Sequence, residues 1–222
     1  MVAASGGPAH IAVVSLDGDE GWVAALRRAC GHVLVPLTWS QAVERGSDDR
    51  RGRLTLLDSA TPRSPGELEA YVRSLAIVTH VVVSTAQEGS AATLLTAGAV
   101  NVLDRNALPG VLGARLGADL RWLRRIRTVP TRDGDGEGAL PFRTQALLLE
   151  ILCAIPGPVC CHDIRRLLGA PGRLMTLPAL RGRIRRLGPH LAERGLECGR
   201  TVRWGADTIT VHAPRASRSP SR

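Results

Sequence analysis

The chain has 222 residues, of which 44% are hydrophobic, a share that is ordinary for a globular protein with a buried core. No stretch reaches the ~18 consecutive apolar residues that a membrane span needs, and residues 1–8 lack both a basic start and an apolar signal core. We therefore expect two compact domains located in the cytoplasm, without a membrane contact.

Positive charge is concentrated toward the C-terminus. All 29 basic residues are arginine, and the formal net charge is +9. Residues 1–125 hold 13 Arg against 12 acidic residues, whereas residues 140–222 hold 14 Arg against 5 acidic residues. Such a field attracts polyanions, so nucleic acid is the first candidate partner, ahead of a membrane surface or an acidic protein.

The first part of the chain alternates short apolar runs with helical patterns. Five strands separated by helices predict a parallel sheet covered on both faces. At about 120 residues, this pattern suits a flavodoxin-like doubly wound domain, which we place at 8–127. The expected strands are 11–16, 33–37, 54–57, 81–83 and 100–103, and the expected helices are 21–29, 65–76, 91–97 and 109–127.

A segment dense in Gly and Asp, 128–139, is typical of a flexible linker and separates this domain from a second one at 140–213. Three helices and a terminal hairpin in the second domain predict a winged helix-turn-helix. The tail 214–222 is rich in Ser, Pro and Arg, and we expect it to be disordered. The expected elements are helices at 142–155, at 162–168 and from Thr176, and a hairpin at 196–211.

The third of these helices is amphipathic. Its apolar residues Leu180, Ile184, Leu187 and Leu191 form one stripe that should face the domain core. Arginines on the opposite side could enter a major groove, where Arg binds guanine edges or phosphates. A solvated basic face without a DNA role is the alternative interpretation. The candidate DNA contacts are Arg173, Thr176, Arg181, Arg183, Arg185, Arg186, Arg200, Thr201 and Arg203.

Several motifs of the second part occur in a fixed order over about 70 residues: Leu140-Pro-Phe-Arg, Leu147-Leu-Leu-Glu-Ile-Leu, Pro156-Gly-Pro-Val, Arg183-Ile-Arg-Arg-Leu187 and Thr201-Val-Arg203. They resemble the DNA-binding domain of OmpR/PhoB-type response regulators. The resemblance implies that the third helix reads the major groove and that the hairpin is the wing. It also implies dimers bound to direct repeats in promoter DNA, with RNA polymerase as a candidate partner.

Two departures from the family stand out in this second part. Pro189, after Gly188, lies inside the pattern of the third helix, and we expect it to kink the helix or to end the base-reading part near Gly188. Trp204-Gly-Ala-Asp207 stands where the family's wing has a Gly-rich aromatic turn.

The first part resembles the family's receiver domain at Leu54-Thr-Leu-Leu-Asp58. The resemblance makes Asp58 the candidate phosphoacceptor, with Asp17, Thr85 and Arg105 around it. Arg105 stands where the family has a lysine, and a guanidinium is bulkier and forked, so it could pair directly with Asp58.

The metal pocket of this receiver-like domain is expected to be degraded. Phosphorylation of a carboxylate needs a divalent cation, and Mg²⁺ prefers a cluster of oxygen ligands. The family's acidic pair after the first strand is replaced here by Ser15 and Leu16. We therefore expect no cofactor, no metal and no ordinary phosphorylation of Asp58. A conventional phosphorylation-controlled regulator is the alternative, and Asp58 could also simply cap a turn.

A receiver-like domain without phosphate chemistry can still make dimers or sense a ligand. The family's dimer surface corresponds to 90–127, where Leu116, Leu120 and Leu123 could form a partner face or pack on the sheet. A small-molecule effector in the former phosphate pocket is a further expectation.

A flavodoxin-like enzyme and a protein-interaction module without DNA binding are the rival classes. No Gly-rich phosphate loop follows the first strand, where the chain reads Ser15-Leu-Asp-Gly-Asp-Glu20, and the six histidines are scattered. We therefore expect that the protein is not an enzyme. The sequence predicts a DNA-binding transcriptional regulator of the response-regulator type.

Overall fold

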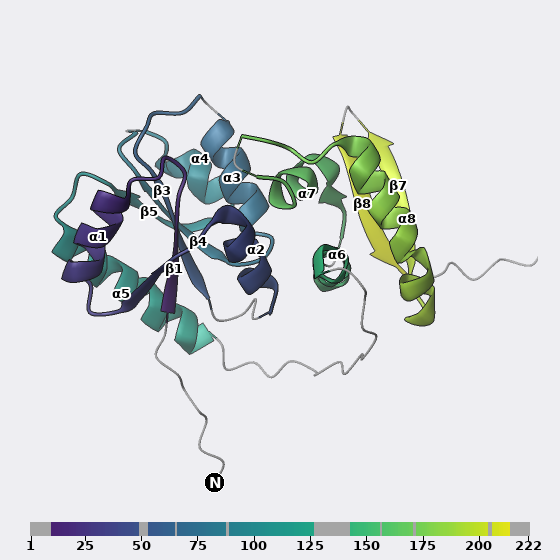
Figure 1. Ribbon diagram of the computed structural model, residues 1–222, viewed down its shortest axis with the longest axis horizontal. Helices are drawn as coiled ribbons and strands as arrows, with labels where there is room; N and C mark the ends of the chain where they lie inside the picture. The colour runs from purple at the N-terminus through teal and green to yellow at the C-terminus, as the bar shows by residue number, and fades with distance from the viewer. Residues whose placement is uncertain are drawn as a thin grey trace, which may run out of the picture.

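The structure is a computed structural model that describes residues 10–48, 53–64, 66–87, 89–126, 143–155, 157–170, 172–203 and 206–213. The predicted linker 128–139 and tail 214–222 lie outside these residues, so the domain limits stay predictions. A parallel sheet with its helices occupies one side of Figure 1, and three helices with a small antiparallel sheet occupy the other. Among the described helices, none is long and apolar enough to cross a bilayer.

The parallel sheet has the strand order β2-β1-β3-β4-β5, which is the flavodoxin-like order. Its middle strands are apolar runs, as expected for strands covered on both faces, and β3 is buried at every position. The predicted fold of the first part is therefore confirmed. The strands are β1 (His10–Ser15), β2 (Val33–Pro36), β3 (Leu54–Ser59), β4 (His80–Thr85) and β5 (Ala99–Asp104).

Helices cover both faces of this sheet. The side chains of α1 (Glu20–Ala29) and α5 (Pro109–Ile126) form one core with it. Those of α2 (Trp39–Asp48), α3 (Glu67–Leu75) and α4 (Ala91–Thr96) form the core on the other face.

The leucines proposed as a partner face on α5 belong to the core instead. Leu116, Leu120 and Leu123 are at most 2% exposed and pack in the cluster with α1 and the sheet. Helical spacing marks the buried side of a helix, and here that side is needed to cover the sheet. Of the two alternatives that the sequence left open for these residues, packing on the sheet is confirmed and the partner face is wrong.

The helix α2 was missed by the sequence prediction. Its ten residues are mostly polar, and among those whose burial is described, Trp39, Ala42 and Val43 are the buried ones that anchor it. A signal for it did exist, because Thr38 and Gln41 form a capping box. The Thr38 backbone N donates to Gln41 Oε1 at 3.0 Å, and the Gln41 backbone N donates to Thr38 Oγ1 at 3.3 Å.

The second part contains the three helices and the hairpin that were expected, together with an unforeseen short strand. The strands form an antiparallel sheet of order β6-β8-β7, with Ile209 of β8 buried against the helices. The elements are α6 (Arg143–Ala154), β6 (Val159–Cys160), α7 (Cys161–Leu167), α8 (Leu177–Glu193), β7 (Glu197–Arg203) and β8 (Ala206–His212).

Pro189 does not end α8, which continues to Glu193. The helix itself therefore does not end near Gly188, and a kink or an end of the base-reading part there stays a prediction. Gly188 and Pro189 are exposed, so water can replace the hydrogen bond that the proline cannot donate. Leu187 and Leu191, on either side, are buried and hold the helix against the core.

The two parts are joined through an aromatic pair on α2 and α3. Trp39 and Tyr71 are each 2% exposed and meet edge to face, with ring centroids 5.4 Å apart. Trp39 Nε1 donates to the carbonyl of Leu167 at 3.2 Å, and the Tyr71 hydroxyl accepts from the Gly172 backbone N at 2.8 Å. Arg166 of α7 lies over the Tyr71 ring at 4.8 Å.

An ion pair reinforces this joint between α3 and α7. The Nε of Arg73 donates to both carboxylate oxygens of Asp163 at 3.1 Å. Asp163 is only 5% exposed and lies in the first turn of α7, where a negative charge is favoured by the helix dipole. The C-terminal part is thus held on the α2 and α3 side of the sheet.

Replacement of Tyr71 should reveal how much this joint stabilises the protein. Tyr71→Phe should lower the free energy of unfolding by about 1 kcal/mol, because the exposed Gly172 can donate to water instead. Tyr71→Ala should cost about 3–5 kcal/mol through lost ring packing. Urea unfolding monitored by tryptophan fluorescence measures both. Val202→Ala, at a side chain that is 61% exposed, is the control. If Tyr71→Ala lowers the free energy of unfolding no more than this control does, the role of Tyr71 in the joint is contradicted.

Candidate functional site

Asp58 lies at the carboxyl end of β3 and is fully buried. Both oxygens of its carboxylate have partners from neighbouring elements. Oδ1 accepts from Arg105 Nε at 2.8 Å, and Oδ2 accepts from Ser15 Oγ, at the end of β1, at 3.1 Å. The direct pairing of Arg105 with Asp58, which the sequence left open, is present in the structure.

Arg105 follows β5 and bridges two carboxylates. Its Nη2 donates to Asp19 Oδ2 at 2.5 Å, and its guanidinium carbon lies 4.7 Å from the centre of the Trp22 ring. Asp19 also caps α1, since its Oδ1 accepts from the Trp22 backbone N at 3.0 Å. Sequence reasoning missed Asp19 as a pocket residue, although its place before a helix marked it as a capping residue.

These contacts shift the ionisation of the three charged groups. Burial raises the pKa of Asp58, and the hydrogen bond and charge of Arg105 offset part of that rise. Burial alone would lower the pKa of Arg105, but hydrogen bonds to Asp58 and Asp19 outweigh it, and the pKa rises. The pKa of Asp19 is lowered, first by the Trp22 backbone N–H and then by Arg105.

Asp17 and Thr85, the other predicted pocket residues, are engaged elsewhere. Asp17 accepts from the backbone N–H groups of Ala60 and Thr61 at 2.7 and 3.1 Å, and Arg63 Nη2 donates to it at 2.8 Å. Thr85 Oγ1 accepts from the Gln87 backbone N at 3.1 Å. Within the described residues, no group of three His, Cys, Asp or Glu side chains could hold a metal ion.

The arginine surface of α8 is the second candidate site. Arg181, Arg185 and Arg186 are exposed, whereas Leu180 and Leu187 on the same helix are buried in the core. The sequence pattern therefore placed the two faces of this helix correctly. Arg183 is half-buried, and its Nη1 is buried without a hydrogen-bond partner among the described residues.

The remaining predicted DNA contacts fall on the approach to α8 and on the hairpin. Thr176 caps α8 by accepting from the Ala179 backbone N at 3.4 Å, and Arg173 is exposed in the preceding turn. Thr201 is exposed on β7. The side chain of Arg203 lies outside the described residues.

Arg200 is tied to the neighbouring strand. Its Nε and Nη2 each donate at 2.6 Å to a different oxygen of Asp207. The hydrogen bond from Arg200 is the first cause of a lowered pKa of Asp207. Since this bidentate pair occupies the guanidinium, Arg200 is less available for a phosphate than the exposed arginines of α8.

The joint between the two parts is made by α6, α7 and the turn before α8. In Figure 1, α6 and α7 lie between the parallel sheet and the unit formed by α8 and the hairpin. Most contacts with the first part come from α6 and α7, which meet α2 and α3, and Gly172 in the turn before α8 adds a hydrogen bond. The joint therefore leaves the exposed face of α8 open.

Comparison with solved structures finds response regulators and receiver domains at low similarity. A response regulator protein from Burkholderia multivorans is 23% identical over 57% of this chain and 100% of that one, with a TM-score of 0.36. A CheY-like receiver domain protein from Methanospirillum hungatei is 16% identical over 54% and 99%, with a TM-score of 0.42. An orphan response regulator of H. pylori is 15% identical over 50% and 97%, with a TM-score of 0.36. No protein-family model and no curated protein matches the sequence. At TM-scores below 0.5 these likenesses carry no functional conclusion.

Removal of the Arg105 charge tests what holds Asp58. Arg105→Met leaves a buried carboxylate unpaired and should lower the free energy of unfolding at pH 7 by about 3 kcal/mol. The folded-state pKa of Asp58 then lies further above its unfolded value. The stability that the unpaired Asp58 carboxylate costs the variant is therefore zero below the unfolded-state pKa of this group. The loss grows as the pH rises through the folded-state pKa. Urea unfolding between about pH 4 and pH 8 should show this trend.

The double variant Asp58→Asn with Arg105→Met is the control for this prediction. A neutral amide is cheaper to bury than an unpaired carboxylate, so the double variant should regain part of the lost stability and lose the pH trend. Wild-type stability of Arg105→Met at pH 7 would contradict the pairing.

Proposed function

We propose that this protein is a cytoplasmic, DNA-binding transcriptional regulator of the response-regulator type, with an OmpR/PhoB-like winged helix-turn-helix and a receiver-like domain that works without phosphorylation. The observation that carries the proposal is the outward arginine face of α8, comprising Arg181, Arg185 and Arg186, on a helix whose apolar face is buried. Such a helix can place forked donors against guanine edges or phosphates in a major groove.

The surroundings of α8 support this assignment. The turn between α7 and α8 is tight, because Ala170 and Arg173 bridge their backbones and a side chain at Gly169 would collide with the Arg173 carbonyl. The hairpin of β7 and β8 follows α8 directly and presents the exposed Thr201 and Val202. A recognition helix after a tight turn, followed by a hairpin, is the arrangement from which a winged helix contacts DNA.

The contacts of Asp58 support control without phosphate. Both of its oxygens are already bound, and Arg105 holds a positive charge where an incoming phosphate and its cation would have to fit. A conventional phosphorylation-controlled regulator is the second candidate, favoured by the position of Asp58 at the end of β3.

We further propose a homodimer through the receiver-like domain. In place of the buried leucines of α5, the exposed apolar side chains of this region are candidates for the contact. Leu95 on α4, Val111 on α5 and Leu108 just before α5 are 47%, 45% and 74% exposed. A dimer would place two α8 helices on DNA, which fits direct repeats in a promoter.

Binding to duplex DNA should depend on Arg185. The wild-type protein is first used to select binding sites from random duplexes. The affinity of Arg185→Ala for these sites should be lower by about tenfold or more, since one bidentate base contact is worth ~1–3 kcal/mol. Arg28→Ala, which removes another exposed arginine, from α1, should bind normally. Gel shifts over a salt series measure both, and affinity should fall steeply with salt. Equal binding by wild type and Arg185→Ala would overturn the role of α8.

Acetyl phosphate should leave the protein unchanged. With Mg²⁺ present, mass spectrometry of the intact chain should show no phosphoryl addition that depends on Asp58, and DNA affinity should not change. Asp58→Asn identifies labelling at other positions. A mass increase that is absent in Asp58→Asn and accompanied by tighter DNA binding would favour the conventional regulator.

A further inference from the structure

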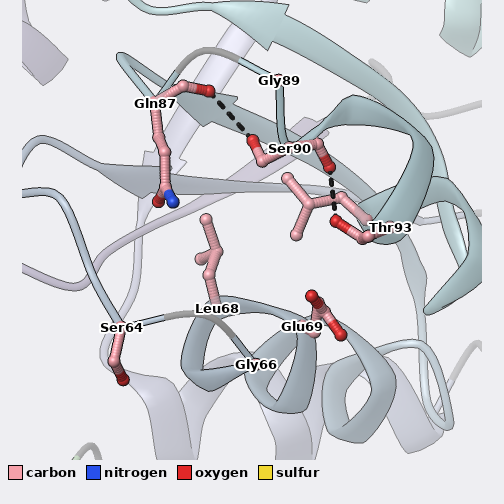
Figure 2. Close-up of a pocket in the computed structure, with 9 residues that line it drawn as sticks. Ser64, Gly66, Leu68, Glu69, Gln87, Gly89, Ser90 and Thr93 are labelled. Atoms are coloured by element: carbon pink, nitrogen blue, oxygen red, sulfur yellow. Dashed lines mark hydrogen bonds between the residues drawn. The ribbon is translucent and has the colours of Figure 1, made fainter.

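A cavity of about 270 Å³ opens between α3 and α4, apart from the Asp58 site. Figure 2 shows Leu68 and Gln87 approaching each other from opposite sides, with Glu69 extending from α3 toward Thr93 of α4. Leu68 and Leu94 are buried and supply apolar contact, while the rest of the wall is polar or glycine.

The hydroxyl groups of this wall are oriented as acceptors. Ser90 Oγ donates to the Gln87 carbonyl at 2.9 Å, and Thr93 Oγ1 donates to the Ser90 carbonyl at 2.8 Å, as the dashed lines in Figure 2 mark. The Ser64 hydroxyl, which donates to Glu67 Oε2 at 3.2 Å, points away from the cavity in Figure 2, so the acceptors of the wall are Ser90 and Thr93. Each hydroxyl has thus used its one proton and offers only lone pairs to a ligand.

Glu69 is the one charged side chain among the described residues of the lining. Its neighbour Glu67 is neutralised by Arg63, whose Nη1 lies 3.0 Å from Glu67 Oε1. Glu69 has no ion pair or hydrogen bond of its carboxylate within the described parts of the chain. The wall therefore combines one unpaired negative charge with several acceptor oxygens, a set that favours a cation rich in hydrogen-bond donors.

We propose that the cavity binds a small organic ammonium that also carries hydroxyl groups. The ammonium would lie against the Glu69 carboxylate, its hydroxyls would donate to Ser90 and Thr93, and its carbon skeleton would contact Leu68. The volume is below the ~300–1,000 Å³ of sites for drug-sized ligands, so the ligand is smaller than those.

Such a ligand would act at the helix that holds the two parts together. Glu69 lies in the first turn of α3, and the same helix carries Tyr71 and Arg73, which contact Gly172 and Asp163 of the second part. An effect of the ligand on DNA affinity, by way of α3, rests on the proposed function. Binding in the cavity does not.

Glucosamine, an ammonium with several hydroxyls, and glucose, which matches it in size but is neutral, are the probes. Isothermal titration of the full chain at pH 6, where the amine is protonated, should show binding of glucosamine at least tenfold tighter than that of glucose. Glu69→Gln should weaken glucosamine binding at least tenfold. Glu150→Gln, which removes an exposed carboxylate from α6, should bind it like the wild type.

Three outcomes would contradict the proposed site. The wild-type protein, titrated at its highest workable concentration with a tenfold excess of glucosamine, would give no heat of binding. Alternatively, glucose would bind with the same affinity as glucosamine, or Glu69→Gln would bind glucosamine as tightly as the wild type. Thr93→Tyr, which places a ring at the cavity mouth, should also abolish binding while thermal unfolding stays cooperative. These titrations contain no DNA. Failure of the DNA-binding proposal would therefore leave them valid, and their failure would leave the gel shifts valid.

Discussion

The buried carboxylate of Asp58 is the constraint around which the receiver-like part is arranged. A charge at the carboxyl end of a central strand, with no exposed surface, must be paired or it raises the cost of folding. Arg105 supplies the pairing charge from the end of β5, and Asp19 at the start of α1 holds the other side of the same guanidinium. One arginine thus ties β3, β5 and α1 together. The positive charge is permanent, because a guanidinium does not release its proton at any physiological pH.

The second constraint lies at the joint of the two parts. Trp39 and Tyr71 form an aromatic pair on the sheet's helices, and each also makes a hydrogen bond to the backbone of the C-terminal part. Arg63 lies 5.7 Å from the Tyr71 ring and pairs with Asp17, so the loop after β1 is connected to the joint through two side chains. This contiguous set of contacts gives the strand ends of the sheet a physical connection to the turn before α8.

The sequence predicted what is periodic, and it missed what depends on distant partners. The five-stranded parallel sheet followed from five apolar runs that alternate with helical patterns, and the arginine face of α8 followed from the spacing of its leucines. The helix α2 escaped notice because most of its residues are polar and its anchor, Trp39, contacts Leu167, 128 positions further along the chain. Because its partner lies on another element, Asp19 was not recognised as a partner of Arg105. The ion pair of Arg200 with Asp207 across the hairpin was missed for the same reason. Spacing along one element reveals its buried face, whereas pairing between elements requires the fold.

The two constraints together determine where control can enter. Because Arg105 is paired with Asp58, the ends of β3 and β5 are held in one conformation. A signal that acts at this place would first have to break a buried ion pair. The helix α3 is different, because its first turn borders an open cavity while its later turns contact the C-terminal part. A ligand can change the free energy of α3 without displacing a buried charge. If α8 binds DNA as proposed, a signal that reaches it through α3 would therefore enter at this cavity, apart from the Asp58 site.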